Sequence, residues 1–435
     1  MKNFVLKGNI LYSKNSDKIE EYPDSYLVCE EGISRGVFRS LPEQYKNLPL
    51  KDYGEKLIIP GLVDLHIHAP QYAYRGMGMD LELMDWLQQQ AFPEEAKYID
   101  LEYAKKAYGI FAQQMKISAT TRASIFATRH SEATKLLMEL LEDTGLMTYV
   151  GKVNMDNDAP ENLIEESADI SAAHTIEWLD GIEGRFQRTK PILTPRFIPS
   201  CTKALLKKLQ QIRTDYDLPV QSHLSENPGE IAFVKELFPE AAFYGDCYDR
   251  YDLFGQKPGS PLTKGTIMAH CVYSGDEEIA LMKQNGVFIA HCPASNMNIS
   301  SGIAPVRKYM EQGLHMGLGS DVAGGQTESM FRAMTDAIQM SKMYWRLVDD
   351  TKKPLTFDEA FYLATKGGGA FFGKVGSFEE GYELDALVLN DEHLPHPQKL
   401  TLHQRLERFA YLGGDVQGIV SKYVAGQCIL KEQTA

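Results

Sequence analysis

The chain has 435 residues, a length that predicts either two domains or one large barrel with additions. Its composition is 43% hydrophobic and 24% charged, as in an ordinary globular protein, and its net charge of −14 argues against a nucleic-acid partner because such a chain repels phosphate backbones. No apolar run fits a signal peptide or a bilayer span, and the six cysteines form no Cys-x-x-Cys pair. We therefore expect a cytoplasmic protein with reduced thiols and no membrane partner.

Both ends of the chain have β character. Residues 1–59 contain short β-like runs broken by polar turns, such as Phe4-Val5-Leu6 and Tyr26-Leu27-Val28-Cys29. The pattern returns within residues 373–435, in the runs 385–389 and 422–430. We predict a small β-sandwich domain that is built from both ends and flanks a central domain, residues 60–372.

The central residues alternate short apolar runs with helical stretches such as residues 94–116. Eight runs fit the strands of an α/β fold, a (β/α)₈ TIM-like barrel: residues 62–68, 120–126, 147–155, 191–197, 219–223, 266–270, 286–291 and 315–321. The C-terminal ends of these runs carry His66, His68, Arg196, His223, His270, His291 and Asp321. Because those ends open onto one face of a barrel, we expect the side chains to meet there.

His66 and His68 form a His-x-His at the end of the first run. Side chains two residues apart on a strand point to the same face, so the two imidazoles can reach one ion. A lone His-x-His also occurs by chance, as exposed or hydrogen-bonded core histidines. The metal-site interpretation therefore depends on further ligands.

His223 and Asp321 offer such ligands. His223 closes an apolar strand, and Glu226 follows in a loop from which it could act as a general base beside the ion. In isolation, His223 and Glu226 fit better a buried histidine followed by a solvated loop acid, and Asp321 fits better a helix N-cap. Together, three imidazoles and one carboxylate suit Zn²⁺ or Fe²⁺ rather than Ca²⁺ or Mg²⁺, and such an ion predicts hydrolytic attack on a carbon electrophile.

Segments at and beside the strand ends carry a resemblance to a known family. They are Pro60-Gly61-Leu62-Val63-Asp64-Leu65-His66-Ile67-His68, His68-Ala69-Pro70-Gln71-Tyr72, Thr194-Pro195-Arg196-Phe197, Gln221-Ser222-His223-Leu224-Ser225-Glu226-Asn227, His291-Cys292-Pro293-Ala294-Ser295-Asn296 and Gly317-Leu318-Gly319-Ser320-Asp321-Val322-Ala323-Gly324-Gly325. With His270, they resemble the metal-dependent amidohydrolase superfamily, and within it the guanine deaminase family. The likeness covers most of residues 57–390, and the combination is specific because independent segments agree in the same order.

This resemblance implies a metal and a set of catalytic roles. The implied ligands of one Zn²⁺ per chain, with Fe²⁺ as the alternative, are His66, His68, His223 and Asp321. Glu226 is the implied general base, and His270 would hydrogen-bond the attacking oxygen. Asp321 would also relay a proton to the departing amine.

The resemblance also implies the substrate, guanine, which hydrolysis converts to xanthine and ammonia in purine catabolism or salvage. Arg196 offers a rigid donor fork to the purine carbonyl oxygen, Gln71 offers a donor and an acceptor, and Phe197 can pack on the ring. The base would further contact His68, His223, Glu226 and Asp321. The implied assembly is a homodimer.

Three other interpretations remain open. A two-metal cyclic-amide hydrolase of the same superfamily would need a modified lysine at a strand end, for which Lys152 is the candidate. A pyrimidine or triazine deaminase would share the mechanism and differ in substrate. A non-catalytic scaffold relative would keep the barrel and lose the metal. The segment with Met79, Met84 and Trp86 fits either a lid or an ordinary packed face.

Overall fold

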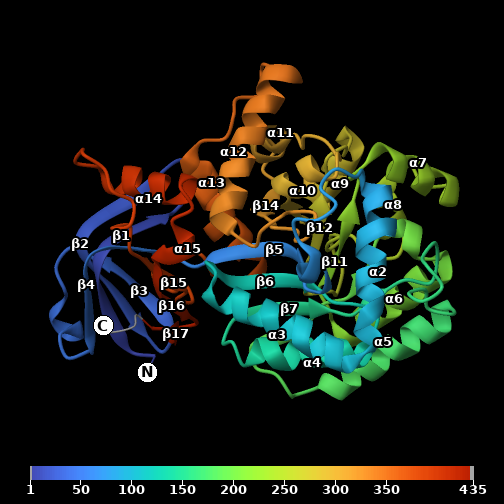
Figure 1. The fold of residues 1–435 in the computed structure, drawn as a ribbon, viewed down its shortest axis with the longest axis horizontal. Helices are drawn as coiled ribbons and strands as arrows, with labels where there is room; N and C mark the ends of the chain where they lie inside the picture. Colours follow the sequence, from blue (N-terminus) through green and yellow to red (C-terminus); the bar gives the residue numbers. More distant parts are fainter. Residues whose placement is uncertain (1, 432–435) are drawn as a thin grey trace.

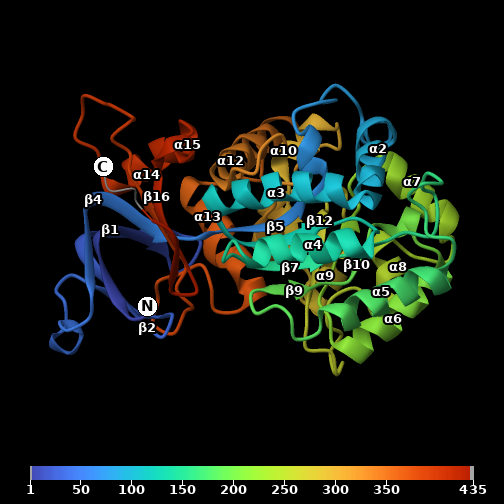
Figure 2. The same cartoon turned by 60° about the horizontal axis from the view of Figure 1, so that its bottom comes forward.

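A curved sheet made from both ends of the chain lies beside a larger α/β part in the computed structural model, which describes residues 2–431 (Figures 1 and 2). The sheet contains β1 (Phe4–Ser13), β2 (Ile19–Glu30), β3 (Ile33–Phe38), β4 (Leu50–Pro60), β15 (Ala386–Leu389), β16 (Ile419–Val424) and β17 (Gln427–Leu430). Their order is β17-β16-β15-β4-β1-β2-β3, in which β1 and β4 are parallel and the other neighbours antiparallel.

The small sheet carries apolar side chains on both faces. In β1, Leu6 and Ile10 pack in a cluster with residues of β2, β4, β15 and β16, whereas Leu11 packs in the large cluster of the α/β part. Both faces of the central strands β1 and β15 are buried, because the sheet curves around its own core on one side and packs against the α/β part on the other. The two chain ends therefore form one continuous sheet. The sequence instead predicts the two sheets of a sandwich. Residue 1 and residues 432–435 of the predicted domain lie outside the described range, and the domain boundaries stay a prediction.

The α/β part contains eight parallel strand positions in chain order. The strands are β5 (Leu62–His68), β6 (Thr120–Phe126), β7 (Met147–Gly151) with β8 (Val153–Asn154), β9 (Thr189–Pro191) with β10 (Thr194–Pro195), β11 (Val220–Leu224), β12 (Thr266–His270), β13 (Phe288–His291) and β14 (His315–Leu318). The predicted runs 147–155 and 191–197 are each two short strands, interrupted at Lys152 and at residues 192–193.

These strands form two arcs, β5-β6-β7-β9 and β11-β12-β13-β14, that join on both sides. A bridge between Leu193 and Val220 links β9 to β11, and the N–H of Asp321, just beyond β14, donates to the carbonyl of His66 in β5 over 2.8 Å. Gly319 permits this closure, since a Cβ there would lie 2.9 Å from the Cβ of His66. The predicted α/β class is confirmed.

Most helices follow the barrel strands, whereas the last two helices of the chain pack against strands of the small sheet. The helices are α1 (Leu83–Trp86), α2 (Phe92–Glu95), α3 (Leu101–Ile117), α4 (Ser131–Glu142), α5 (Ala168–Ile182), α6 (Lys203–Tyr216), α7 (Pro228–Leu237), α8 (Tyr244–Asp249), α9 (Asp276–Asn285), α10 (Pro293–Asn298), α11 (Val306–Glu311), α12 (Met330–Leu347), α13 (Phe357–Tyr362), α14 (Leu402–Tyr411) and α15 (Asp415–Gly418). Side-chain caps start several of them: Asp100 accepts from Glu102 N, and Thr202 accepts from Leu205 N.

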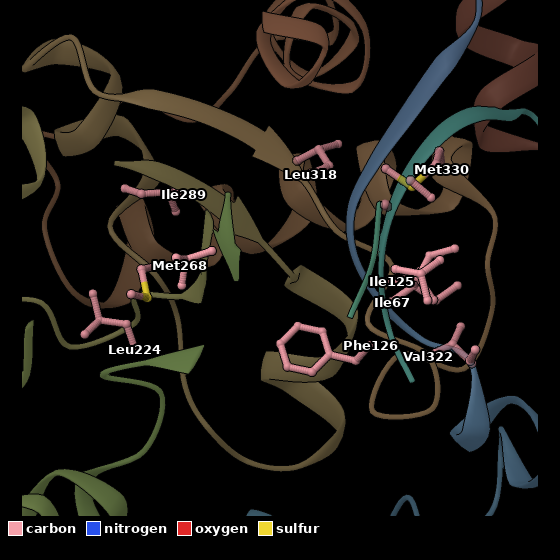
Figure 3. Packing of buried hydrophobic residues seen from close by; sticks show 14 of the residues in the cluster. Ile67, Ile125, Phe126, Leu224, Met268, Ile289, Leu318, Val322 and Met330 are labelled. Atoms are coloured by element: carbon pink, nitrogen blue, oxygen red, sulfur yellow. The ribbon is translucent and has the colours of Figure 1, made fainter. Parts of the chain in front are cut away.

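Alternate residues of the strands fill two different cores. Figure 3 shows Met268 of β12 and Ile289 of β13 in the large cluster, across from Ile67 of β5. Ile267, the neighbour of Met268, belongs instead to a small cluster inside the barrel. Side chains therefore alternate between the two cores along each strand. The polar side chains of the predicted site follow at the C-terminal ends of the strands. Within residues 2–431, no helix combines the length and the hydrophobicity that a membrane crossing requires.

Candidate active site

A β-bulge in β5 turns His66 and His68 toward the barrel axis. Val63 and Leu65 point inward, because they contact Ala290 and other residues of β12 and β13, which are not neighbours of β5. Between Asp64 and Ile67, β5 advances three residues while β6 advances two, from Ala123 to Ile125. The extra residue shifts the alternation, so two histidines can face inward after Leu65.

Four predicted residues meet at the C-terminal mouth of the barrel. The Nε2 of His68 lies 3.2 Å from the Nε2 of His66 and 3.3 Å from the Nε2 of His223. Asp321 places its Oδ1 3.1 Å from the Nε2 of His66 and 3.5 Å from that of His68. The four side chains thus converge on one point from both arcs of the barrel.

The protonation of this cluster suits a bound cation. Burial lowers the pKa of His66, and it lowers those of His68 and His223 far more, so the three imidazoles are neutral. The pKa of Asp321 lies well below its usual range, because the neighbouring histidines outweigh the effect of burial. Nδ1–H of His223 donates to the carbonyl of Arg196 over 2.6 Å, which turns the Nε2 lone pair inward. The donor set, three nitrogens and one carboxylate, fits Zn²⁺.

Glu226 and His270 stand beside the cluster. Glu226 Oε2 lies 3.4 Å from His270 Nε2, which is 3.6 Å from Asp321 Oδ2. Burial raises the pKa of Glu226 to about 7, although His270 opposes the rise. Burial alone would lower the pKa of His270, but Glu226 and Asp321 raise it above its ordinary value. These groups can therefore exchange protons near neutral pH.

Two hydrogen bonds from outside the predicted set orient these groups. Ser301 Oγ donates to Glu226 Oε1 over 3.0 Å, and His270 Nδ1 donates to Asn296 Oδ1 over 3.0 Å. His270, Asp321 and Ser225 adopt left-handed backbone conformations, with φ of 72°, 47° and 47°. Such conformations cost energy in residues other than glycine and cluster at functional sites.

The cluster opens into a cavity at the mouth of the barrel. Its lining residues are His68, Gln71, Leu83, Trp86, Leu87, Arg196, Phe197, His223, Glu226, His270, Ile299 and Asp321. Every predicted substrate residue is in this lining. The lining includes Leu83, Trp86 and Leu87, which cover the cavity with apolar surface. They belong to the segment after β5 that the sequence interprets as either a lid or a packed face.

Arg196 and Gln71 share a buried partner that the sequence analysis missed. Glu95 accepts from Arg196 Nη1 over 2.6 Å and from Gln71 Nε2 over 2.9 Å. The guanidinium of Arg196 also lies over the ring of Phe92, 5.2 Å from its centroid. No spacing or strand-end position distinguishes Glu95 from Glu94 in the sequence, so no signal was available to find it.

Lys152, the candidate for a two-metal site, lies apart from the cluster. Its Nζ donates to Glu165 Oε1 over 2.7 Å, and both side chains are fully buried. Glu165 also accepts from Ser171 Oγ over 2.5 Å and from the backbone N–H of Met155 over 3.2 Å. This pair fills a polar pocket between the barrel and α5, so Lys152 is held away from the histidines.

Comparison with known proteins gives the class to which this site belongs. Residues 57–422 match the model of the amidohydrolase family, and the chain belongs to that family. The relatives it is similar to include guanine deaminases. The guanine deaminase of Dictyostelium discoideum is 35% identical over 453 residues, covering 98% of each chain.

Two solved structures extend this similarity. The guanine deaminase from C. acetobutylicum with bound guanine in the active site has 47% identity and a TM-score of 0.93, covering 98% of this chain and 100% of that one. The E. coli guanine deaminase has 28% identity and a TM-score of 0.85, covering 100% of both chains. The likeness therefore includes the barrel and the small sheet together.

Proposed function

We propose that this chain catalyses the hydrolytic deamination of guanine to xanthine and ammonia. The observation that carries the proposal is the cavity, because members of the histidine and carboxylate cluster line it together with Arg196, Gln71 and Phe197. Hydrolysis of a purine needs both parts in one enclosed space: groups that activate water, and fixed partners that orient the ring. Similarity to guanine deaminases over nearly the whole chain supports this substrate.

The cluster would hold one metal ion per chain. The proposed ligands are His66, His68, His223 and Asp321, which suit Zn²⁺ and also Fe²⁺. When bound, the ion supplies hydroxide at neutral pH by lowering the pKa of water from about 15.7 to about 7. The neutral imidazoles are ready for binding, since a histidine must lose its proton to act as a ligand.

Glu226, His270 and Asp321 handle the protons and the charge. Glu226 takes a proton from the attacking water and delivers it to a ring nitrogen of guanine, a role that suits its pKa of about 7. His270, held by Asn296, donates a hydrogen bond to the attacking oxygen. Asp321 relays the second proton to the amine, which departs as ammonia.

Arg196, Gln71 and Phe197 recognise the base. The guanidinium of Arg196 donates to the carbonyl oxygen of guanine, and the Gln71 amide contacts another edge of the ring. Phe197 is 6% exposed and offers its ring face as an apolar surface. Guanine is therefore read by groups that the surrounding protein already holds in place.

The alternatives differ in what they require of this chain. A two-metal hydrolase would need Lys152 beside the cluster, and its pairing with Glu165 disfavours that arrangement. A scaffold without a metal would lack ligands, whereas all four proposed ligands converge. A pyrimidine or triazine deaminase is separated by substrate preference alone. The predictions of a homodimer and of a cytoplasmic location stay predictions.

The proposal is tested by kcat/KM for guanine, adenine and cytosine in the wild type and in Arg196→Ala. We expect the wild type to favour guanine by roughly 10⁴-fold or more, because the amine of adenine would point donors at the donors of Arg196. Arg196→Ala should reduce guanine use while the metal content stays unchanged.

Arg129→Ala is a matched control, since Arg129 is half-buried and is absent from the cavity lining. It should keep the wild-type preference. Comparable wild-type kcat/KM values for guanine and either rival base would contradict guanine as the specific substrate and leave the assignment to the amidohydrolase family intact.

A further inference from the structure

Glu95 occupies a position from which it can control base recognition without touching the base. It ends α2, its side chain is 1% exposed, and it is absent from the cavity lining. Its two oxygens each hold one residue of the lining, Oε1 the amide of Gln71 and Oε2 the guanidinium of Arg196. Glu95 can therefore act on the substrate only through these two side chains.

The hydrogen bonds in this network have a fixed direction. The backbone N–H of Ala323 can only donate, so the atom of Gln71 that it meets over 3.2 Å must be Oε1. The Nε2 of Gln71 then faces Glu95, and Arg196 can only donate as well. Glu95 must accept at both oxygens, which an ionised carboxylate does and a glutamine cannot.

We propose that Glu95 is a positioning residue for base recognition, which fixes the amide of Gln71 and the guanidinium of Arg196 in the orientation that reads guanine. The inference rests on the proposed function. With one Nε2 hydrogen donated to Glu95, the second hydrogen of Gln71 is left for the ligand. The carboxylate also compensates the buried positive charge of Arg196. Without it, that charge would be costly to bury near the proposed metal ion.

The same helical segment links this role to the cover of the cavity. Leu83, Trp86 and Leu87 line the cavity, and the chain continues through a π-helical turn, Leu87–Ala91, into α2, where Phe92 contacts the guanidinium of Arg196. Glu95 therefore connects two parts of the site. It belongs to the segment that covers the cavity, and it holds Arg196, which is proposed to bind the substrate carbonyl.

Glu95→Gln tests the proposal because it keeps the shape and removes one acceptor. The new amide can accept from Arg196 or from Gln71, and its NH₂ group opposes the other donor. We expect KM for guanine to rise by about 10- to 10³-fold, kcat to fall by less than about 10-fold, and the metal content to remain at the wild-type level. A KM for guanine within threefold of the wild type would overturn the proposal.

Glu94→Gln is the matched control. Glu94 is the adjacent carboxylate, is 6% exposed, and pairs with Lys97 over 2.7 Å and with the hydroxyl of Tyr103, away from the cavity lining. The same change of charge in the same helix should leave KM for guanine within about twofold of the wild type. An equal rise of KM in both variants would overturn a specific role for Glu95.

The double variant Gln71→Glu with Glu95→Gln separates positioning from stability. In it, the N–H of Ala323 and the new amide at position 95 both donate to the carboxylate at position 71, and Arg196 donates to the oxygen of that amide, so every hydrogen bond is satisfied. We expect the double variant to have a higher Tm than Glu95→Gln, which leaves one buried donor unpaired, while KM for guanine stays raised because position 71 no longer offers a donor to the base. Recovery of KM together with Tm would overturn the proposal. Failure of the proposed function would instead appear as no guanine turnover by the wild type.

Discussion

Glu226 is under opposing influences that set the pKa of its carboxyl group at about 7. Burial raises its pKa to about 7, while His270 and the hydroxyl of Ser301 stabilise the ionised form and limit the rise. A group with a pKa near the working pH can take up a proton and release it within one turnover.

Glu226→Gln removes the titrating group and keeps the size of the side chain. Turnover should fall on the order of 10²- to 10⁴-fold, the usual range for a general base, while metal content and Tm stay near wild-type values. Steady-state rates together with metal analysis of the purified variant test this. Glu236→Gln, at an exposed position of α7, is the control and should behave like the wild type. Turnover of Glu226→Gln within threefold of the wild type would assign the base to another residue.

The sequence could predict residues whose position follows from the barrel itself. His66, His223 and Asp321 stand at or just beyond the ends of apolar runs, and parallel strands bring such ends to one face whatever the details of packing. Glu95 and Ser301 could not be found in this way. They reach the site through a helical segment and a loop whose paths depend on tertiary packing, and neither lies at a recognisable spacing from the ligands.

Strand β5 shows why an element can be predicted while its detailed geometry is not. Period-two alternation identifies the strand, but strict alternation would put Leu65 and His66 on opposite faces. The bulge between Asp64 and Ile67 resolves this conflict, and Asp64 supports it by accepting from the backbone N–H groups of His66 and Ser320 over 3.2 and 3.0 Å. A buried acceptor of this kind has no signature in the hydrophobic pattern.

Asp358 joins three elements of the chain through one carboxylate. Its Oδ2 lies 3.1 Å from Nε2 of His403 in α14, and its Oδ1 accepts from the N–H of Ile19 in β2 over 2.7 Å. The hydrogen bond to Asp358 raises the pKa of His403, against the effect of burial, and Glu407 and Glu21 act in the same direction. The folded state therefore binds this proton more tightly than the unfolded state does.

His403→Gln should have an effect on stability that depends on pH. Because the folded pKa lies above the ordinary value of 6.5, the charged pair contributes fully below about pH 6.5, and the contribution is lost as pH rises through the folded pKa. The pair is partly exposed to solvent, at 27% for His403 and 21% for Asp358, and should add no more than about 1 kcal/mol. Urea unfolding at pH 5.5 and 8.5 should show a larger loss for the variant at pH 5.5, and the exposed His393→Gln should show no such difference. A loss that is larger at pH 8.5 would contradict the assigned direction.

The small sheet and the barrel are tied together by a buried ion pair. Arg122 in β6 is 2% exposed and donates to Asp385 Oδ2 over 2.6 Å and to Glu383 over 2.8 Å, and the N–H of Gly61 donates to the carbonyl of Asp385 over 3.1 Å. The pairing of both chain ends was predictable from their shared β pattern. The curvature that makes them one continuous sheet was not, since it depends on contacts with the barrel.

At the scale of the whole molecule, the proposed metal would join the two arcs of the barrel. His66 and His68 come from the first arc, whereas His223 and Asp321 come from the second. A ligand that binds the folded chain but not the unfolded one adds stability, about 4 kcal/mol when its concentration is 1,000 times its Kd. Metal content, stability and activity should therefore change together.

Removal of the metal by a chelator should abolish guanine deamination and lower Tm, and Zn²⁺ should restore both, with about one equivalent bound per chain. The loss of Tm follows because four buried ligands from the two arcs would be left facing one another without a shared cation. His66→Ala supplies the control: its Tm should respond far less to the chelator, because one ligand is already missing. Full activity, or an unchanged Tm, in a preparation shown by metal analysis to be metal-free would contradict the role given to the cluster.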